Sequence, residues 1–372
     1  MALVQYQVEA GTSYATLTTV VSNVQNVSLK YGRERPLDQY SANTASIGIR
    51  YPTGYATPNA LFVTGTWIRI SVRLGTAGTY RQLWVGRITD VIIEYGIPYS
   101  AGVGNLDYVT LTCEGNFAAF GRVQGNGYAM TAKSLSAQAG SCATETSLNI
   151  STNSTFGGTQ QFPATTISGS WGDWVNQAVL TMNGRLIDIS DGILLVNAYY
   201  KIAGFWGNFT DTANDASNHP YDQIAFSSFA DNYYTQVIVT PESFGAATVQ
   251  SGAAPYRTYQ VNTLNSSTSQ ATDFANYLLS TYNSQTPRIL SVTCNLNAQV
   301  GDLPYYNMGE IGSTVTVTFR GIVFNCVLEG ATFSGNPDTA SATFYLSAQD
   351  LNNYLILDDP IYGKLDENKL GY

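Results

Sequence analysis

Apolar and polar residues alternate with a period of two along most of this chain, and this pattern constrains the fold more than any other feature. The alternation is clear over residues 68–74, 109–113 and 315–319. Because successive side chains of a strand point to opposite faces, such runs bury one face of a sheet. Clusters of Gly, Pro, Asn and Asp separate the runs, as expected between strands. The sequence therefore predicts a mainly β fold with minor α.

The sequence predicts a similar group of three strands at two places, about 240 residues apart in the chain. Residues 65–114 and 312–347 each begin with Gly and run through a strand, a turn, a second strand, a loop and a third strand. A short helix is expected after each group, over GNFAAFG and over SAQDLNNYL. Any β-rich chain contains strand triplets, so chance remains an alternative. If the duplication is real, three copies of the chain would present six similar units in a ring with head-to-tail contacts.

Two stretches break the period of two and predict amphipathic helices packed on sheets. Apolar residues fall at helical spacing over residues 171–182, where Asn183-Gly184 ends the run, and again over residues 270–283. A hairpin with Ser190-Asp191-Gly192 at its tip is expected after the first helix. Residues 140–170 and 208–221 are polar and predicted to be loops.

These elements divide the chain into three expected domains. A first tube-type β-barrel domain is expected over residues 1–125, and a second, with a C-terminal extension, over residues 233–372. Between them, residues 126–232 are expected to form a smaller α/β domain. The fold class is thus mainly β, with two similar barrel domains and an inserted α/β domain.

The charge of the chain bears on its partners. Charged residues make up 12% of the sequence, about half of the ~25% that is typical of soluble proteins. Either a surface covered in an assembly or a surface rich in Ser, Thr, Asn and Gly would explain this. The net charge of −9 argues against a protein that grips nucleic acid through its phosphates. No signal peptide or membrane-spanning run is expected from the sequence.

The sequence contains few residues of the types that catalyse reactions or bind metals. The single histidine, His219, is expected in a surface loop, and no GxSxG or phosphate-binding loop is present. Four cysteines (Cys113, Cys142, Cys294 and Cys326) have no metal-site spacing and are predicted to be buried free thiols. Acidic pairs at 358–359 and 366–367 are predicted to be solvated turns or contact charges. We therefore expect no catalytic residue, no cofactor, no metal and no enzyme activity.

Tyrosine is abundant, with 26 residues, and several occur in pairs. The pairs are Tyr199-Tyr200, Tyr233-Tyr234 and Tyr305-Tyr306. Tyrosine is common at protein interfaces, where it combines apolar area with a hydroxyl group. The same pairs would also suit a carbohydrate-binding surface protein in host attachment, which is the alternative function. A glycan-cleaving enzyme is a third possibility and would need two carboxylates facing a cleft.

Six segments, in order over more than 300 residues, carry a resemblance to a known family. They are YGRERPLDQYSANTASIGIRYPTG; LFVTGTWIRISV with LWVGRITDV; VTLTCEGNFAAFGRV; WGDWVNQAVLTMNGRLIDISDGILLV; QVIVTPES with SGAAPYRTYQVNTL and ATDFANYLLSTY; and DLNNYLILDDPIYGKLDENKLGY. Together they resemble the tail hub proteins (minor tail or baseplate hub proteins) of long-tailed bacteriophages with a non-contractile tail.

This resemblance implies a structural virion protein at the tail tip, made in the host cytoplasm. It implies a homotrimeric hub that closes or extends the tail tube, adapts six-fold to three-fold symmetry and lines the DNA channel. The implied partners are the chain itself, a tail tube or distal tail protein, a tape measure protein and central tip or fibre proteins. DNA would pass without specific binding, and we expect an acidic channel wall because three copies would carry three times the −9 of one chain.

Overall fold

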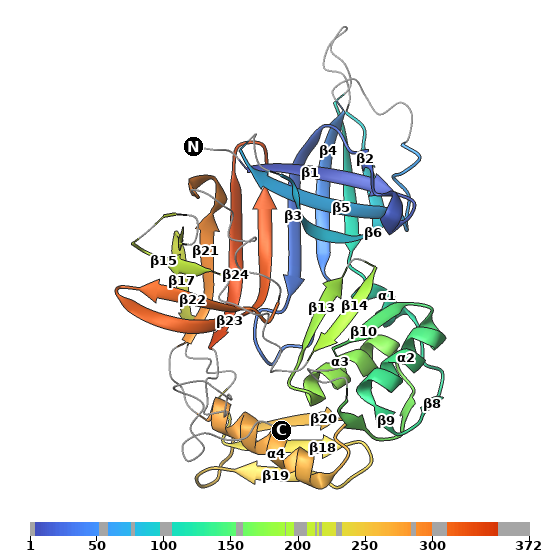
Figure 1. Ribbon diagram of the computed structural model, residues 1–372, viewed down its shortest axis with the longest axis vertical. Coiled ribbons are helices and arrows are strands. Elements are labelled where there is room, and N and C mark those ends of the chain that lie inside the picture. The colour runs from blue at the N-terminus through green and yellow to red at the C-terminus, as the bar shows by residue number, and fades with distance from the viewer. Residues whose placement is uncertain are drawn as a thin grey trace.

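The fold was determined as a computed structural model of the 372-residue chain. The structure describes residues 4–51, 59–75, 79–96, 106–153, 159–189, 191–196, 207–212, 214–215, 218–227, 233–283, 288–299 and 311–348. Figure 1 shows a β-rich body, a helical lobe beside one end of it, and a small sheet covered by a helix beyond that lobe. The mainly β fold class is confirmed.

The N-terminal part of the body is an antiparallel group of seven strands. They are β1 (Val4–Gly11), β2 (Thr19–Val20), β3 (Val24–Gly32), β4 (Thr44–Tyr51), β5 (Trp67–Leu74), β6 (Arg81–Glu94) and β7 (Asp107–Glu114). Alternate residues of β7, such as Val109, Leu111 and Cys113, are fully buried, so one face of the sheet forms the core.

The C-terminal part of the body is built from a second group of strands, which joins the same sheet. They are β15 (Asn208–Thr210), β16 (Asn218–Pro220), β17 (Gln223–Ser227), β21 (Arg288–Asn295), β22 (Thr314–Phe319), β23 (Ile322–Gly335) and β24 (Ala340–Ala348). The two groups share one continuous apolar core. The hairpin turn between β22 and β23 uses left-handed backbone at Arg320 and Gly321, with φ of 50° and 78°.

The helical lobe follows β7. It contains the helices α1 (Phe117–Arg122), α2 (Leu135–Thr146) and α3 (Trp171–Thr181). Its short strands are β8 (Tyr128–Met130), β9 (Lys133–Ser134), β10 (Asn149–Thr152), β11 (Gln161–Phe162), β12 (Thr165–Ile167), β13 (Arg185–Ile189) and β14 (Gly192–Val196). Ser170 and Asp173 form a reciprocal capping box at the start of α3. The predicted helix over 171–182 and the β13–β14 hairpin are confirmed.

Two predicted loops are wrong. Residues 140–170 contain the second half of α2 and the strands β10, β11 and β12, and residues 208–221 contain β15 and β16. In α2, Leu135, Ala139 and Cys142 lie at helical spacing and are buried, while Ser134 caps the helix. Small polar residues fill the other positions, so the apolar stripe is narrow and the helix resembles a loop in composition.

A small unit is inserted between β17 and β21. It comprises β18 (Gln236–Pro241), β19 (Ala247–Gln250), β20 (Thr258–Thr263) and the helix α4 (Thr268–Tyr282). Phe274, Ala275 and Leu278 of α4 pack against Val237 and Val239 of β18, so the unit has its own apolar core. The predicted helix over residues 270–283 is confirmed.

The domain boundaries expected at residues 125 and 232 remain predictions. Strands from both sides of residue 232 belong to one sheet. β15, β16 and β17 precede this position but pair with one another, with β22 or with β21. Within the described strands, the pairing path ends openly at β2 and at β16. Closure of either group into a barrel therefore also remains a prediction.

Candidate functional site: an assembly sheet of two matched units

The two strand groups repeat the same order of pairing over six strands each. In the first unit the order is β3-β4-β7-β6-β5-β1, and in the second unit it is β17-β21-β24-β23-β22-β15. The predicted repeat of three strands is thus confirmed in β5-β6-β7 and β22-β23-β24 and extends beyond them. One pairing differs: β1 lies antiparallel to β5, whereas β15 lies parallel to β22. The sequence pattern had predicted only three strands in each unit, those from β5 to β7 and from β22 to β24.

The longest strand of each unit is built in the same way. β6 and β23 are both 14 residues long, and each uses opposite edges in its two halves. The first half of β6 pairs with β5 and the second half with β7; the first half of β23 pairs with β22 and the second half with β24. The register shifts between Ile88 and Asp90 in β6, and between Leu328 and Gly330 in β23. These irregularities align the units residue by residue, with Thr89 matching Glu329.

Backbone hydrogen bonds at the start of each unit support this alignment. Gly65 and Gly312 have φ of 90° and 94°, a conformation that favours glycine. The Gly65 amide donates to the Ile88 carbonyl at 2.8 Å, and the Gly312 amide donates to the Leu328 carbonyl at 2.7 Å. In return the Ile88 amide donates to Thr66 at 2.9 Å, and the Leu328 amide donates to Ser313 at 3.0 Å. The two bulges are therefore held by the same pair of contacts.

The units join edge to edge through β3 and β23. The pairing is antiparallel, from Gly32 opposite Gly330 to Val27 opposite Gly335. Backbones approach closely at the first pair, because a Cβ atom on Gly32 would lie 2.3 Å from the Glu329 carbonyl oxygen. This β3–β23 seam makes one continuous sheet out of two units that are far apart in sequence.

A buried ion-pair network lies beside the seam. Glu329 Oε2 accepts a hydrogen bond from Arg33 Nε at 2.8 Å, and Oε1 accepts from Arg185 Nη2 at 3.0 Å and from Ser347 Oγ at 2.7 Å. Only 1% of the Glu329 side chain is exposed. Burial alone would raise its pKa, but the two guanidinium groups and the hydrogen bonds outweigh burial and hold the pKa at about 2. The network ties the first unit, the second unit and β13 together.

A second carboxylate, that of the half-buried Asp188, fixes the helical lobe to the first unit. Its Oδ2 accepts from Asn43 Nδ2 at 2.6 Å, and its Oδ1 accepts from the Phe117 amide at 3.2 Å. The Asn43 side chain also accepts from the Gly32 amide at 3.0 Å. Burial raises the pKa of Asp188 to about 7, although both hydrogen bonds act to lower it. The carboxyl is thus linked, through Asn43, to the end of β3 at the seam.

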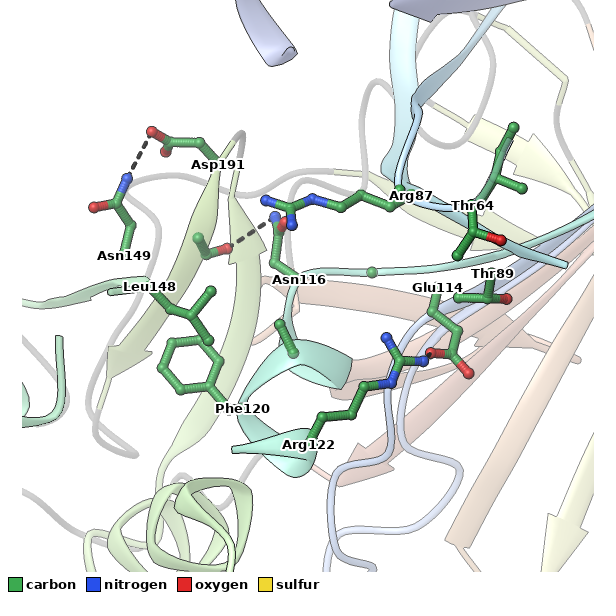
Figure 2. A pocket seen from close by; sticks show the side chains of 15 residues that line it. Thr64, Arg87, Thr89, Glu114, Asn116, Phe120, Arg122, Leu148, Asn149 and Asp191 are labelled. Atoms are coloured by element: carbon green, nitrogen blue, oxygen red, sulfur yellow. Dashed lines mark hydrogen bonds and ion pairs between the residues drawn. The ribbon is translucent and has the colours of Figure 1, made fainter. Parts of the chain in front are cut away.

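A hollow of about 470 Å³ lies where β6, β7 and α1 face the β13–β14 hairpin. Figure 2 shows Asn116 between the two sides; its Nδ2 donates to the carbonyls of Ile189 and Gly192 at 2.7 and 3.2 Å. The Glu114 carboxylate pairs with Arg122, and Asp191 accepts from Asn149 at 2.7 Å. Both acids therefore have polar partners, and the two Asn116 hydrogen bonds hold the hairpin against the end of β7.

The position expected for His219 is wrong. The residue lies in β16 and is fully buried, with Nδ1 3.2 Å from Gln299 Oε1. The Gln299 amide nitrogen donates to the carbonyls of Pro220 and Asn295, so its oxygen is oriented to accept from the imidazole. The composition of the ASNHPYD segment suggested a loop, but pairing of β16 with β15 buries the ring.

Other predicted residues have mixed outcomes. All four cysteines are buried and free, as predicted. Tyr233 and Tyr234 are half-buried and contact Arg257 and Tyr259 respectively, with a ring separation of 5.0 Å in the second case. The other tyrosine pairs, the acidic pairs at 358–359 and 366–367, and most of the helix expected after Ser347 lie outside the described residues. Glycan binding thus remains a prediction.

Within the ranges given above, no cluster of His, Cys, Asp and Glu has the form of a metal site. None of the helices in the same ranges is long and apolar enough to span a membrane. The residues that sequence reasoning missed are those of the seam. A Glu within the apolar run VLEGATF was the available signal, since a carboxylate in such a strand needs a buried partner.

No protein-family profile matches this sequence, and no curated protein sequence matches it. Solved structures do share its fold. The chain is similar to the 43 kDa tail protein of prophage MuSo2 from Shewanella oneidensis, with 11% identity and a TM-score of 0.63 over 93% of this chain and 98% of that one. It is also similar to a tail protein from Neisseria meningitidis MC58, with 11% identity and a TM-score of 0.66 over 93% and 97% of the two chains.

A third similar structure is a chain of the Francisella PdpA–VgrG complex in its lidded form. Identity is 10% and the TM-score is 0.55, over 93% of this chain and 52% of that chain. At such identities the similarity establishes the fold of the chain, which is that of phage tail proteins and of a chain from a VgrG complex.

Proposed function

We propose that this chain is a structural subunit of a bacteriophage tail tip, where three copies form the baseplate hub of a long, non-contractile tail. One observation carries the proposal: two units with the same six-strand order lie edge to edge within one chain. The similarity in fold to two phage tail proteins supports it. A duplicated unit has a direct geometric use in a ring whose neighbours have different symmetries.

In this hub, three chains present six similar units around a three-fold axis. The ring would match six-fold symmetric tail tube or distal tail proteins on one side and three-fold symmetric central tip or fibre proteins on the other. The units correspond to tube-type barrel domains at residues 1–125 and 233–372, with the α/β domain of residues 126–232 outside the ring. β15 to β17 would complete the second barrel.

The channel of the hub would pass DNA and contact the tape measure protein. Three copies would carry −27, three times the net charge of −9 of one chain. An acidic wall repels phosphate and would not retain the moving genome. A basic channel wall in the assembled ring would contradict this part of the proposal.

The mass of the purified chain in solution tests the proposal. Native mass spectrometry should give three times the 40.2 kDa of one chain, and three copies should be counted per purified tail. A chain that is monomeric at micromolar concentration and also present as single copies in assembled tails would contradict the hub. Peptide mapping of virions should place the chain in tails.

A further inference from the structure

The β3–β23 seam has a counterpart whose two edges are not paired with each other among the strands that the structure describes. At the seam, β3 of the first unit covers the second half of β23 in the second unit. The equivalent of β3 is β17, and the equivalent of that half of β23 is residues 90–95, the end of β6 together with Tyr95. Among the strands that the structure describes, β17 pairs with β21 alone, and residues 90–94 pair only with β7.

Apolar side chains are exposed at both of these open edges. At the end of β6 and the start of β7, Ile92, Tyr95 and Tyr108 are 48%, 68% and 41% exposed. In β17, Phe226 is 40% exposed, and its ring contacts Phe319 and Phe324. Edge strands with exposed apolar side chains favour pairing with another chain.

Geometry excludes pairing of these two edges within one chain. In Figure 1, β17 lies at one side of the β-rich body and β6 at the other, with β24, β3 and β4 between them. The two edges are different surfaces, so a contact between them joins copies head to tail. Such a contact would repeat, between chains, the pairing that β3 and β23 make within a chain.

We propose that β17 of one copy pairs antiparallel with residues 90–95 of the next copy, and that this contact closes the ring. The partner is thus a second copy of this chain. The inference rests on the proposed function, because it names the contact by which three copies would assemble. Around a ring of six units, the β3–β23 seam within each chain then alternates with the proposed contact between neighbouring chains.

The internal repeat also gives the register. Ser28 pairs with Ser46 of β4, and Ala225 pairs with Ser291 of β21. Ser46 and Ser291 in turn pair with equivalent positions of β7 and β24. Ala225 is therefore the equivalent of Ser28. Glu94 is the equivalent of Ser334, because they pair with Tyr108 and Ser341 at matching positions.

Ser28 lies directly opposite Ser334 in the seam. Ala225 of one copy should consequently lie opposite Glu94 of the next copy. Directly opposed residues of antiparallel strands have Cα atoms about 4.5–5.5 Å apart, which is within the range that a disulfide bond spans.

A cysteine pair tests this register in the full-length chain. Glu94→Cys with Ala225→Cys should form disulfides between copies under mild oxidation, and most of the chain should run as covalent trimer on a non-reducing gel. The native thiols are buried. Ser28→Cys with Ser334→Cys is the matched control, because both sites are exposed within the intact seam and should form a bond inside one chain. Thr144→Cys with Ala225→Cys should form none between copies.

The outcomes separate the two proposals. A covalent trimer from the Glu94 and Ala225 pair, absent from each single variant, supports the contact. A trimer by native mass spectrometry in which this pair forms no bond, while the Ser28 and Ser334 pair does, overturns the contact and leaves the trimeric hub standing. A monomer for the unmodified chain, both alone and in tails, overturns the hub and this contact together.

Discussion

Arg33 and Glu329, which are 296 positions apart in the sequence, form a buried ion pair with 2.8 Å between Nε and Oε2. Arg33 follows β3 in the first unit, and Glu329 lies at the bulge of β23 in the second. Their side chains are 8% and 1% exposed. The position where the two units meet thus depends on a charge pair that water does not screen.

Removal of the Glu329 carboxylate should destabilise the chain strongly. Glu329→Ala leaves the guanidinium groups of Arg33 and Arg185 buried without their counter-charge, which typically costs about 3–5 kcal/mol. Urea unfolding followed by tryptophan fluorescence measures the loss. Glu34→Ala is the control: it removes an exposed ion pair with Lys30 and should change the free energy of unfolding by about 1 kcal/mol or less. Equal losses in both variants would contradict the assigned role of Glu329.

Stability should fall in acid through Glu329. Because its pKa is about 2 in the folded chain and 4.5 in its ordinary state, the folded chain binds the proton more weakly than the unfolded chain. The stabilisation is complete above pH 4.5 and is lost as the pH falls towards 2. Unfolding free energies measured across this window should have a steeper slope for the unmodified chain than for Glu329→Gln. Parallel slopes would exclude the ion pair as the cause.

Asp188 should have the opposite dependence on pH. Its pKa is raised from 3.8 to about 7, so between these values the folded chain holds a proton that the unfolded chain has released. Its contribution to stability therefore decreases as the pH rises through this window, by up to about 1.4 kcal/mol per pH unit. Relative to the unmodified chain, Asp188→Asn should become more stable as the pH rises. Asp191→Asn, at an exposed position, should retain the slope due to Asp188.

The seam should not tolerate a side chain at Gly330. A Cβ atom at this position would lie 2.6 Å from the carbonyl oxygens of Arg33 and Tyr31, so the two strands must separate. Gly330→Ala should cost about 1–3 kcal/mol, as is typical of overpacking. Gly121→Ala in α1, where no atom lies within 4 Å of the added carbon, is the control and should be neutral or slightly stabilising. Thermal melts followed by circular dichroism compare the two.

Sequence periodicity predicted the elements that bury a broad apolar face. Trp174, Val175 and Ala178 of α3 gave a clear helical period, and the alternation in β7 gave a strand. α2 was missed because Leu135, Ala139 and Cys142 form only a narrow stripe among small polar residues. Local pattern therefore identifies elements with strong amphipathic character and overlooks those with little of it.

The seam and its charges could not be predicted in the same way. Its pairing joins Val27 to Gly335, and no local pattern specifies which strand edges meet over such a separation. His219 was misplaced for a related reason, since its burial depends on parallel pairing of two three-residue strands. The sequence repeat did indicate two similar sheets, but their shared bulge contacts at Gly65 and Gly312 became visible only in the structure.

Electron microscopy of the purified oligomer tests the central claim, that a duplicated unit lets three copies present six. Averaged views along the symmetry axis should show a closed ring of six similar β-rich units around an open channel, with three helical lobes outside it. The underlying symmetry should be three-fold. A ring with six helical lobes, a two-fold particle, or a three-fold particle in which only three β-rich units surround the axis would contradict it.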